Sequence, residues 1–263
     1  MANASAPVAW LGARLIEFFD GTVGFFALAA RAAAGAASPP LRVRDTFLQL
    51  HFAANESAPI ICLCVSFAAA VTIIESSFHM KLVVQNDALV PGFAALLILR
   101  ELGTVIAALL LASRVGAGIA AEVGSMQITE QVDALRMLGI DPIRFIVVPR
   151  LVACTVAGVL LAAVANLACL FCAMLVSVAK LGYTAGGFVT AMRAFVHLQD
   201  LEFACVKGAA FGSVIPLISC YFGFRCQAGA EGVGTATTNS VVASSVAIIG
   251  LDFALSFLFS FFY

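Results

Sequence analysis

Residues 93–150 read FAALLILRELGTVIAALLLASRVGAGIAAEVGSMQITEQVDALRMLGIDPIRFIVVPR, and this stretch decides the fold. It begins with an apolar run, Phe93–Leu111, which is close to the roughly 20 residues that an α-helix needs to cross a membrane. Arg100 and Glu101 interrupt the run near its middle. The longest polar interruption in the chain, residues 112–150, follows it. The pattern predicts a membrane span with charges inside it, joined to an extramembrane segment.

The rest of the chain has the same apolar character. Hydrophobic residues make up 62% of the 263 positions and charged residues 11%, whereas soluble domains carry about 25% charged residues. A surface so poor in charge is expected to face lipid. Five stretches are long enough to span a membrane: Ala58–Phe78, Phe93–Leu111, Leu151–Val178, Leu201–Phe224 and Val241–Phe262. We therefore predict an all-α integral membrane protein with a five-span domain over residues 58–263.

Residues 1–57 are expected to form a separate N-terminal helical segment. Trp10–Ala37 is apolar but contains four charged residues, among them Glu17 and Asp20. These two residues argue against a cleaved signal peptide, which needs an unbroken apolar stretch. A helix that lies in the membrane interface, with its aromatic side chains in the lipid boundary, fits this composition better.

The basic residues predict the orientation. If the N-terminus is cytoplasmic, nine of the 14 Lys and Arg residues lie in cytoplasmic segments. Only Lys81, Lys180 and Arg193 then lie outside, and Arg100 and Lys207 lie within spans. Cytoplasmic loops of membrane proteins carry an excess of Lys and Arg. We therefore expect a cytoplasmic N-terminus and, after five spans, a C-terminus on the opposite side.

The polar interruption contains an amphipathic pattern. Ile128, Val132 and Leu135 fall on one helical face, and charged residues and a glutamine occupy the rest. A glycine and a proline follow, where a helix is expected to stop. The pattern predicts a cytoplasmic helix over about residues 124–138. Two interpretations stay open: a helix resting on the membrane surface, or a docking helix whose apolar ridge enters the groove of a soluble partner.

The charges inside the spans indicate a transport site. A charge near the bilayer centre costs about 2.5–3.5 kcal/mol on insertion scales. Arg100 and Glu101 are adjacent and so point about 100° apart on a helix, which means that each needs another partner. Lys207 in the fourth span and Asp252 in the fifth are the expected partners, balancing two positive with two negative charges. An ion network that only fixes helix packing is the alternative, although intramembrane ionisable residues more often serve function.

Two separated blocks give the sequence a family resemblance. Residues 99–142, followed by VVPR, resemble the signature of the MlaE/YrbE permeases, the membrane subunits of MCE-type ABC lipid transporters. Residues 228–259, AGAEGVGTATTNSVVASSVAIIGLDFALSFLF, resemble a second block of that family. The resemblance extends from about residue 45 over nearly the whole remaining chain. Thr104 and Ser113 depart from it, since proline and glycine are usual there.

This resemblance implies an assembly. It implies an MlaE-like ABC permease fold and a homodimer of five-span subunits, each with an N-terminal interfacial helix, in the inner membrane of a Gram-negative bacterium. A cytoplasmic ABC ATPase dimer would grip the helix between spans two and three and would bind ATP and Mg. A periplasmic MCE-domain ring would sit above. The cargo would be a phospholipid moved between the inner and outer membranes, as in the maintenance of outer-membrane lipid asymmetry.

The family resemblance and the charges within the spans together indicate which residues couple to the ATPase, contact phospholipid and form the buried charge network. We expect ATPase coupling to involve Glu122, Thr129, Glu130, Gln131, Asp133 and Arg136. We expect phospholipid to contact Ile74, Phe78, Leu97, Arg100, Glu101 and Thr104. The buried charge network is expected to include Lys207 and Asp252. We expect this chain itself to bind no metal, cofactor or nucleic acid.

Other functions find less support in the sequence. It has no G-x-x-x-x-G-K-[ST] phosphate loop and no G-x-S-x-G motif, which favours a transporter subunit over an enzyme. A stand-alone secondary transporter or channel is the alternative, but it should show internal repeats or a charge-lined pore. Gly208 and Gly212 form a G-x-x-x-G motif, which permits close helix approach. We expect that motif to pack inside one subunit rather than to form the dimer seam.

Overall fold

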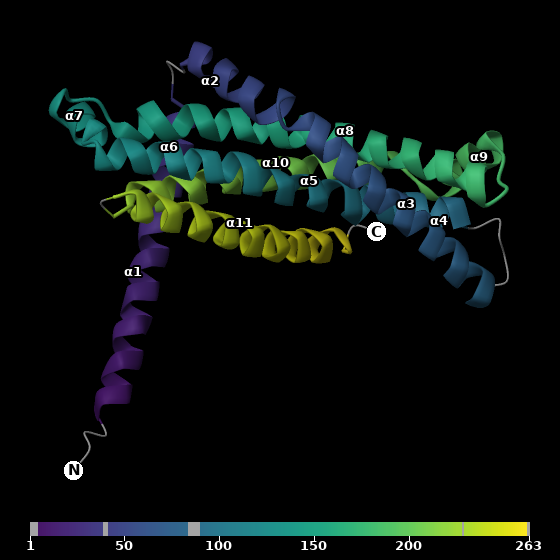
Figure 1. Ribbon diagram of the computed structural model, residues 1–263, viewed down its shortest axis with the longest axis horizontal. Helices are drawn as coiled ribbons and strands as arrows, with labels where there is room; N and C mark the ends of the chain where they lie inside the picture. Colours follow the sequence, from purple (N-terminus) through teal and green to yellow (C-terminus); the bar gives the residue numbers. More distant parts are fainter. Residues whose placement is uncertain (1–4, 39–41, 84–89, 228, 262–263) are drawn as a thin grey trace.

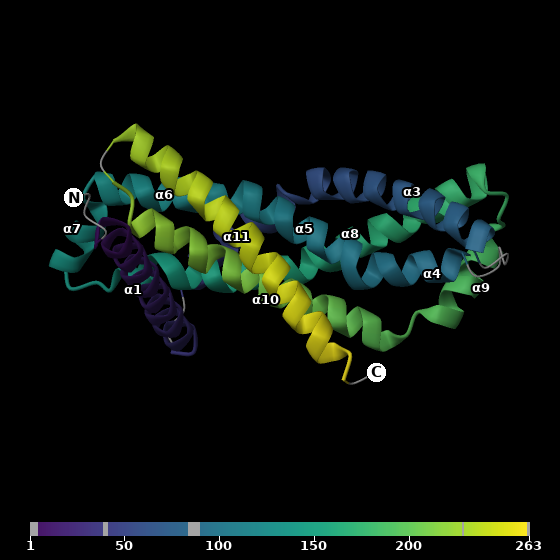
Figure 2. The same cartoon turned by 90° about the horizontal axis from the view of Figure 1, so that it is seen from below.

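The computed structural model describes residues 5–38, 42–83, 90–227 and 229–261, and every regular element in these ranges is a helix. Five helical runs among them are long and apolar enough to cross a membrane. They are Val43–Met80, Val90–Ile128, Ile143–Lys180, Leu198–Phe224 and Ala230–Phe259. The predicted all-α fold with five spans is therefore confirmed. The spans run roughly along the long axis of the molecule (Figures 1 and 2).

The first three spans are built from several consecutive elements. The first consists of α2 (Val43–Leu50), the π-helical turn η1 (His51–Asn55) and α3 (Ala58–Val83). The second consists of α4 (Val90–Leu97), η3 (Ile98–Leu102), α5 (Gly103–Leu111), η4 (Ala112–Gly116) and α6 (Ala117–Ile128). The third consists of η5 (Ile143–Val147) and α8 (Val148–Lys180). The last two spans are α10 (Leu198–Phe224) and α11 (Ala230–Phe259), and three further helices are α1 (Ser5–Ala36), α7 (Gln131–Met137) and α9 (Ala185–Phe195).

The second span is longer than the sequence pattern predicted. Its 39 residues measure about 58 Å at 1.5 Å per residue, whereas the hydrocarbon core is about 30 Å thick. The prediction that the span ends at Leu111 is wrong, because the helix continues without a break to Ile128. Residues 112–128 contain no proline, and the glycines among them weaken a helix without ending it. The span must tilt or extend beyond the membrane.

The helix predicted over about residues 124–138 is in fact two helices. α6 ends at Ile128, and Glu130 has a φ of 59°, in the left-handed region. This conformation is uncommon for residues other than glycine because the Cβ atom crowds the backbone. The chain therefore changes direction at Glu130 before α7 begins, and the prediction of one continuous helix is wrong. Figure 1 shows α7 at one end of the bundle.

Close approach of α8 and α10 forms the centre of the bundle. A Cβ atom on Gly208 would lie 2.7 Å from the carbonyl oxygen of Gly158, and one on Gly212 would collide with the Cys154 backbone. Both partners belong to α8 of the same chain. The G-x-x-x-G motif packs within the subunit, as predicted. Small residues are what allow the two backbones to meet.

Helix α1 lies across the end of the bundle that carries α7, rather than along the spans (Figures 1 and 2). The Tyr221 hydroxyl of α10 donates a 2.9 Å hydrogen bond to the Gly21 carbonyl and fixes the crossing point. Phe19, Val23 and Phe26 form an exposed apolar stripe on α1, each more than 60% exposed. A transverse helix with an exposed apolar face has the properties of an interfacial helix.

Helix α9, at the opposite end of the bundle from α7, was not predicted. Thr184 caps its start by accepting a 3.1 Å hydrogen bond from the Gly187 amide. Phe188 is buried, and Phe195 packs against Gly92 of α4, where a Cβ atom would have no room. The helix therefore covers the start of the second span. A threonine before an apolar run was the sequence signal for this helix.

Candidate functional site

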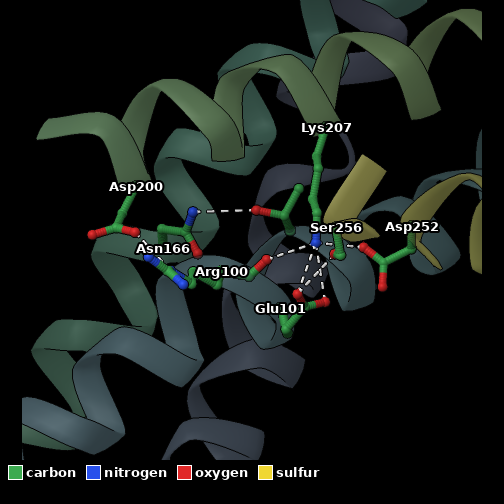
Figure 3. Close-up of polar contacts among 8 residues, drawn as sticks. Arg100, Glu101, Asn166, Asp200, Lys207, Asp252 and Ser256 are labelled. Carbon is green, nitrogen blue, oxygen red and sulfur yellow. Dashed lines mark hydrogen bonds and ion pairs between the residues drawn. The ribbon is translucent and has the colours of Figure 1, made fainter. Parts of the chain in front are cut away.

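The centre of the bundle holds a cluster of charged side chains around Lys207 (Figure 3). The Lys207 side chain is completely buried. Its Nζ donates to the Arg100 carbonyl at 2.9 Å and to Glu101 Oε2 at 3.0 Å. It also forms an ion pair with Asp252 Oδ1 at 2.6 Å. The predicted network of Glu101, Lys207 and Asp252 is therefore present, and it joins the second, fourth and fifth spans.

Glu101 is the most exposed member of this cluster. The Ser256 hydroxyl of α11 donates to its Oε1 at 3.1 Å, while Lys207 holds Oε2. The Glu101 side chain is nevertheless 45% exposed, whereas Asp252 is 20% exposed. Glu101 thus presents a fixed carboxylate at the open side of the cluster. Sequence reasoning missed Ser256, because an uncharged polar residue in an apolar helix gives no specific signal.

Arg100 has a different partner from the one predicted. Its Nε lies 2.6 Å from Oδ1 of Asp200, and Asp200 is fully buried. Asp200 Oδ2 also accepts a 2.9 Å hydrogen bond from the His197 amide at the start of α10. The expectation that two cations balance two carboxylates is wrong, because Asp200 adds a third carboxylate. The signal that could have found it is an acidic residue in the first turn of a helix, where it caps the N-terminus.

A π-helical turn shapes the backbone at the cluster. Arg100 and Glu101 both lie in η3, where the Gly103 amide bonds to the Ile98 carbonyl five residues back. Such π turns inside α-helices occur frequently at functional sites. Next to it, the Asn166 amide nitrogen donates to Thr104 Oγ1 at 3.3 Å, and both residues are buried. The polar cluster thereby extends to α8.

The predicted phospholipid contacts do not all meet in one place. A cavity of about 510 Å³ lies between α3 and α4, and Leu97 lines it. Ile74 and Phe78 are exposed on α3 but do not line this cavity. Leu97 precedes Glu101 by about one helical turn on the same span, although Glu101 is not among the residues that line the cavity. Thr104 is buried against Asn166 instead, and its role in lipid contact stays a prediction.

Most of the cavity surface is apolar, although four of its eight lining residues are polar or charged. Glu75 Oε2 and His79 Nε2 on α3 lie 3.6 Å apart. The lining residues are Val71, Thr72, Glu75, Ser76, His79, Met80, Phe93 and Leu97. The site therefore offers an apolar space that ends one helical turn from a fixed carboxylate.

The predicted coupling residues lie on α6 and α7 and at the break between these helices. Asp133 and Arg136 form a 2.7 Å ion pair on the exposed face of α7. Gln131 Nε2 donates to Thr129 Oγ1 at 3.0 Å across the break. Glu122 pairs with Arg150 of α8 at 2.7 Å, so it ties α6 to the third span.

The apolar ridge expected on this segment faces inward. Val132 is completely buried and Leu135 packs against the core, so these two residues do not form the outward docking ridge of the second of the two open interpretations. The exposed apolar residues of the segment are Met137 and Leu138, 88% and 74% exposed. The period of the sequence pattern gave the buried face correctly. It gave no means of telling that this face packs against the bundle and not against a partner.

Comparison with known proteins places the chain in a family. It matches the model of the permease MlaE over residues 46–258. It is 35% identical to a probable ABC transporter permease protein of Rickettsia felis over 95% of this chain and 96% of that protein. It is 31% identical to the intermembrane phospholipid transport system permease protein MlaE of Haemophilus influenzae, over 94% of each.

A plant protein is similar over a shorter part of its length. The chloroplastic protein TRIGALACTOSYLDIACYLGLYCEROL 1 of Arabidopsis thaliana is 34% identical over 82% of this chain and 61% of that protein. The family model covers the charge cluster, α6 and α7. The chain therefore belongs to the MlaE permease family of ABC transporters.

Proposed function

We propose that this chain forms the membrane pathway of an ATP-driven transporter that moves phospholipid between the inner and outer membranes. The observation that carries the proposal is the position of the half-exposed Glu101 carboxylate. It lies one helical turn after Leu97, and Leu97 lines the apolar cavity. A phospholipid needs an apolar path for its acyl chains and local polarity for its headgroup. The name of the Haemophilus influenzae relative, a phospholipid transport permease, supports the same cargo.

The second span gives this site a mechanical connection to an ATPase. Glu101 and Ile128 belong to one helical run, and the 27 residues between them correspond to about 40 Å. A helix that is continuous over this length transmits displacement from one end to the other. We propose that two partner ATPases, which bind ATP and Mg, move α7 and the end of α6. That movement would shift Glu101 against Lys207 and Asp252 and change the space available to the lipid.

We further propose that the chain works as a homodimer. Thr238 and Asn239 of α11 are exposed although they lie in an apolar span. Polar groups facing lipid are costly, so such residues usually face protein or a water-filled cavity. A second subunit packed on this part of α11 would cover them. In this proposal a periplasmic MCE-domain ring sits at the end of the bundle that carries α9, and α7 faces the cytoplasm.

Purification of the native complex tests the proposal. The tagged chain is extracted from its own membrane in mild detergent, and the recovered material is identified by mass spectrometry. We expect two copies of the chain, an ABC ATPase, an MCE-domain protein and bound phospholipid. Recovery of the chain without ATPase and lipid would contradict the proposal and support a stand-alone transporter.

A pair of matched variants tests the site itself. Glu101→Gln removes the charge of the exposed carboxylate and should lower the amount of phospholipid that co-purifies at least severalfold. Glu202→Gln, on the exposed side of α10, removes a carboxylate outside the cluster and should leave the lipid content unchanged. Equal lipid content in both variants and the unaltered protein would show that Glu101 does not contact the cargo.

A further inference from the structure

Two cavities lie where α1 crosses the bundle. One of about 730 Å³ lies between α1, α10 and α11, and one of about 310 Å³ lies between α1, α10 and the loop after α7. Tyr221 of α10 and Arg225, the residue that follows this helix, line both cavities. These cavities are separate from the charge cluster, because Arg225 follows Lys207 by 18 positions, which corresponds to about 27 Å along α10.

The smaller cavity is lined by an excess of positive charge. Arg31, Arg136 and Arg225 line it, together with a single carboxylate, that of Asp141. Arg31 Nη2 lies 3.3 Å from Asp141 Oδ1, which neutralises one of the three arginines. Arg136 pairs with Asp133, which lies outside the lining. With both ion pairs counted, the described side chains at this cavity carry one more positive than negative charge, that of Arg225.

Arg225 is the arginine best placed to receive an anion. Its Nη1 donates to the Tyr221 hydroxyl, and its guanidinium lies 5.3 Å from the Tyr221 ring centroid. Neither contact neutralises its charge. The tyrosine fixes the position of the guanidinium between the two cavities, since its own hydroxyl is bonded to the Gly21 carbonyl of α1. A planar guanidinium held in this way is suited to bind a phosphate group through two nitrogen atoms.

The surroundings of the cavity match a lipid. Ala27, Leu28 and Phe224 provide apolar walls. Phe19 and Phe26 belong to the exposed apolar stripe of α1. A helix with such a stripe places its apolar face at the boundary between headgroups and acyl chains. Basic pockets between membrane helices on the cytoplasmic side bind the headgroups of anionic lipids.

We propose that this arginine cavity binds the headgroup of an anionic phospholipid of the surrounding leaflet, at a site distinct from the transport pathway. The phosphate lies between Arg225 and Arg31, and the acyl chains lie along α1. Because Asp141 already occupies Arg31, the phosphate competes with it for this arginine. Asp141 lies in the loop after α7, four positions beyond Met137, so lipid binding would loosen the attachment of α1 to the coupling segment. An acidic segment of a protein partner could meet the same charges, but the apolar walls and the stripe of α1 favour a lipid.

Lipid titration of the purified full-length chain tests this site. The chain in mild detergent is titrated with dioleoylphosphatidylglycerol or dioleoylphosphatidylcholine, and bound lipids are counted by native mass spectrometry. We expect Arg225→Gln to weaken phosphatidylglycerol binding about fivefold and to leave phosphatidylcholine binding unchanged. Arg225→Lys keeps the charge but not the planar fork of nitrogen atoms, so it should weaken phosphatidylglycerol binding, but less than Arg225→Gln does.

A gain in affinity provides a test that misfolding cannot imitate. Asp141→Asn removes the competing charge but keeps the oxygen that accepts the Ile143 amide hydrogen bond. It should bind phosphatidylglycerol several times more tightly. Arg193→Gln, which alters an exposed arginine of α9 at the other end of the bundle, is the matched control and should bind as the unaltered protein does.

Three outcomes would overturn the proposal. Unchanged phosphatidylglycerol binding by Arg225→Gln would show that the cavity is not a headgroup site. Competition by soluble glycerol phosphate at the same concentration as the lipid would assign the site to a soluble phosphate ester. Loss of the co-purifying ATPase from Arg225→Gln, with lipid binding intact, would assign the arginines to a protein partner.

Discussion

At the scale of single residues, Lys207 holds the charge cluster together. Its ammonium is completely buried and contacts both Glu101 and Asp252. Lys207→Met would leave these two carboxylates near each other without a cation, which typically costs about 3–5 kcal/mol for a buried ion pair. We expect a clear loss of thermal stability in detergent, measured by the unfolding temperature. Restored stability in the triple variant with Glu101→Gln and Asp252→Asn would identify charge imbalance as the cause.

The outcome for Lys207→Met separates two roles of the cluster. If the variant unfolds at the same temperature as the unaltered protein, the ion network does not stabilise the bundle. If the triple variant is stable but no longer retains phospholipid, the charges serve the cargo. A triple variant that retains both its stability and its bound phospholipid would contradict the proposal that the charge cluster holds the headgroup of the transported lipid.

Most of the charged residues of the cluster could be predicted from the sequence, because a charge inside a membrane is costly and needs a partner. Lys207 and Asp252 could be paired with Glu101 from sequence, because each is an ionisable residue within an apolar run that needs a partner. Asp200 could not be paired with Arg100 in this way. It lies one residue before the apolar run as the sequence defines it, where a charge costs little. Asn166 and Ser256 carry no charge, so no comparable penalty points to them.

At the scale of helices, the contact between α8 and α10 depends on glycine. A Cβ atom on Gly208 would lie 2.7 Å from the Gly158 carbonyl oxygen and 2.9 Å from the Ala162 Cβ. Gly208→Ala should therefore force the helices apart and destabilise the protein by about 1–3 kcal/mol, as overpacked cores do. Gly250→Ala on α11, where no atom lies within 4 Å of the new Cβ, should be neutral or slightly stabilising. Thermal unfolding of both variants decides this; equal stability would show that the helices adapt to the added methyl group.

The exposed end of α7 makes a different prediction. Met137 is 88% exposed and lies beside Leu138, which is 74% exposed, on the same segment that buries Val132. Met137→Asp should lower the amount of co-purifying ATPase several times while the unfolding temperature of the chain stays the same. Ala37→Asp places the same charge on another position outside the core, after α1, and should not change ATPase recovery. Full recovery with Met137→Asp would exclude this surface from the contact.

The sequence predicts which segments form spans better than it predicts where the helices end, and the reason is physical. An apolar run of about 20 residues has few alternatives to a membrane span, so the five spans follow from hydropathy. A helix can continue past the apolar run wherever no residue stops it, as the second span does from residue 112 to Ile128. The break at Glu130 has the opposite character. It occurs without glycine or proline, so the local sequence contains no breaker.

At the scale of the whole molecule, the two ends of the bundle are predicted to face different compartments. Helices α1 and α7 lie at one end and α9 at the other (Figure 1). Gly139 follows α7 and Gly182 precedes α9, and both have a positive φ and open space around them, since a Cβ atom at either position would have no neighbour within 4 Å. A short protease-cleavable epitope inserted after either glycine should therefore leave the bundle folded. The excess of arginine in the predicted cytoplasmic segments predicts that the Gly139 site is cytoplasmic.

Protease treatment of intact spheroplasts distinguishes the two orientations. We expect cleavage at the Gly182 insertion from outside and protection of the Gly139 insertion until the membrane is lysed. The reverse pattern would place α7 outside, away from any cytoplasmic ATPase, and would contradict both the orientation and the proposed energy coupling. The expected pattern would place the arginine cavity in the cytoplasmic leaflet, because Arg31 and Arg136 lie at the end that carries α7. In that case, the anionic lipid that we propose for the arginine cavity must come from the cytoplasmic leaflet.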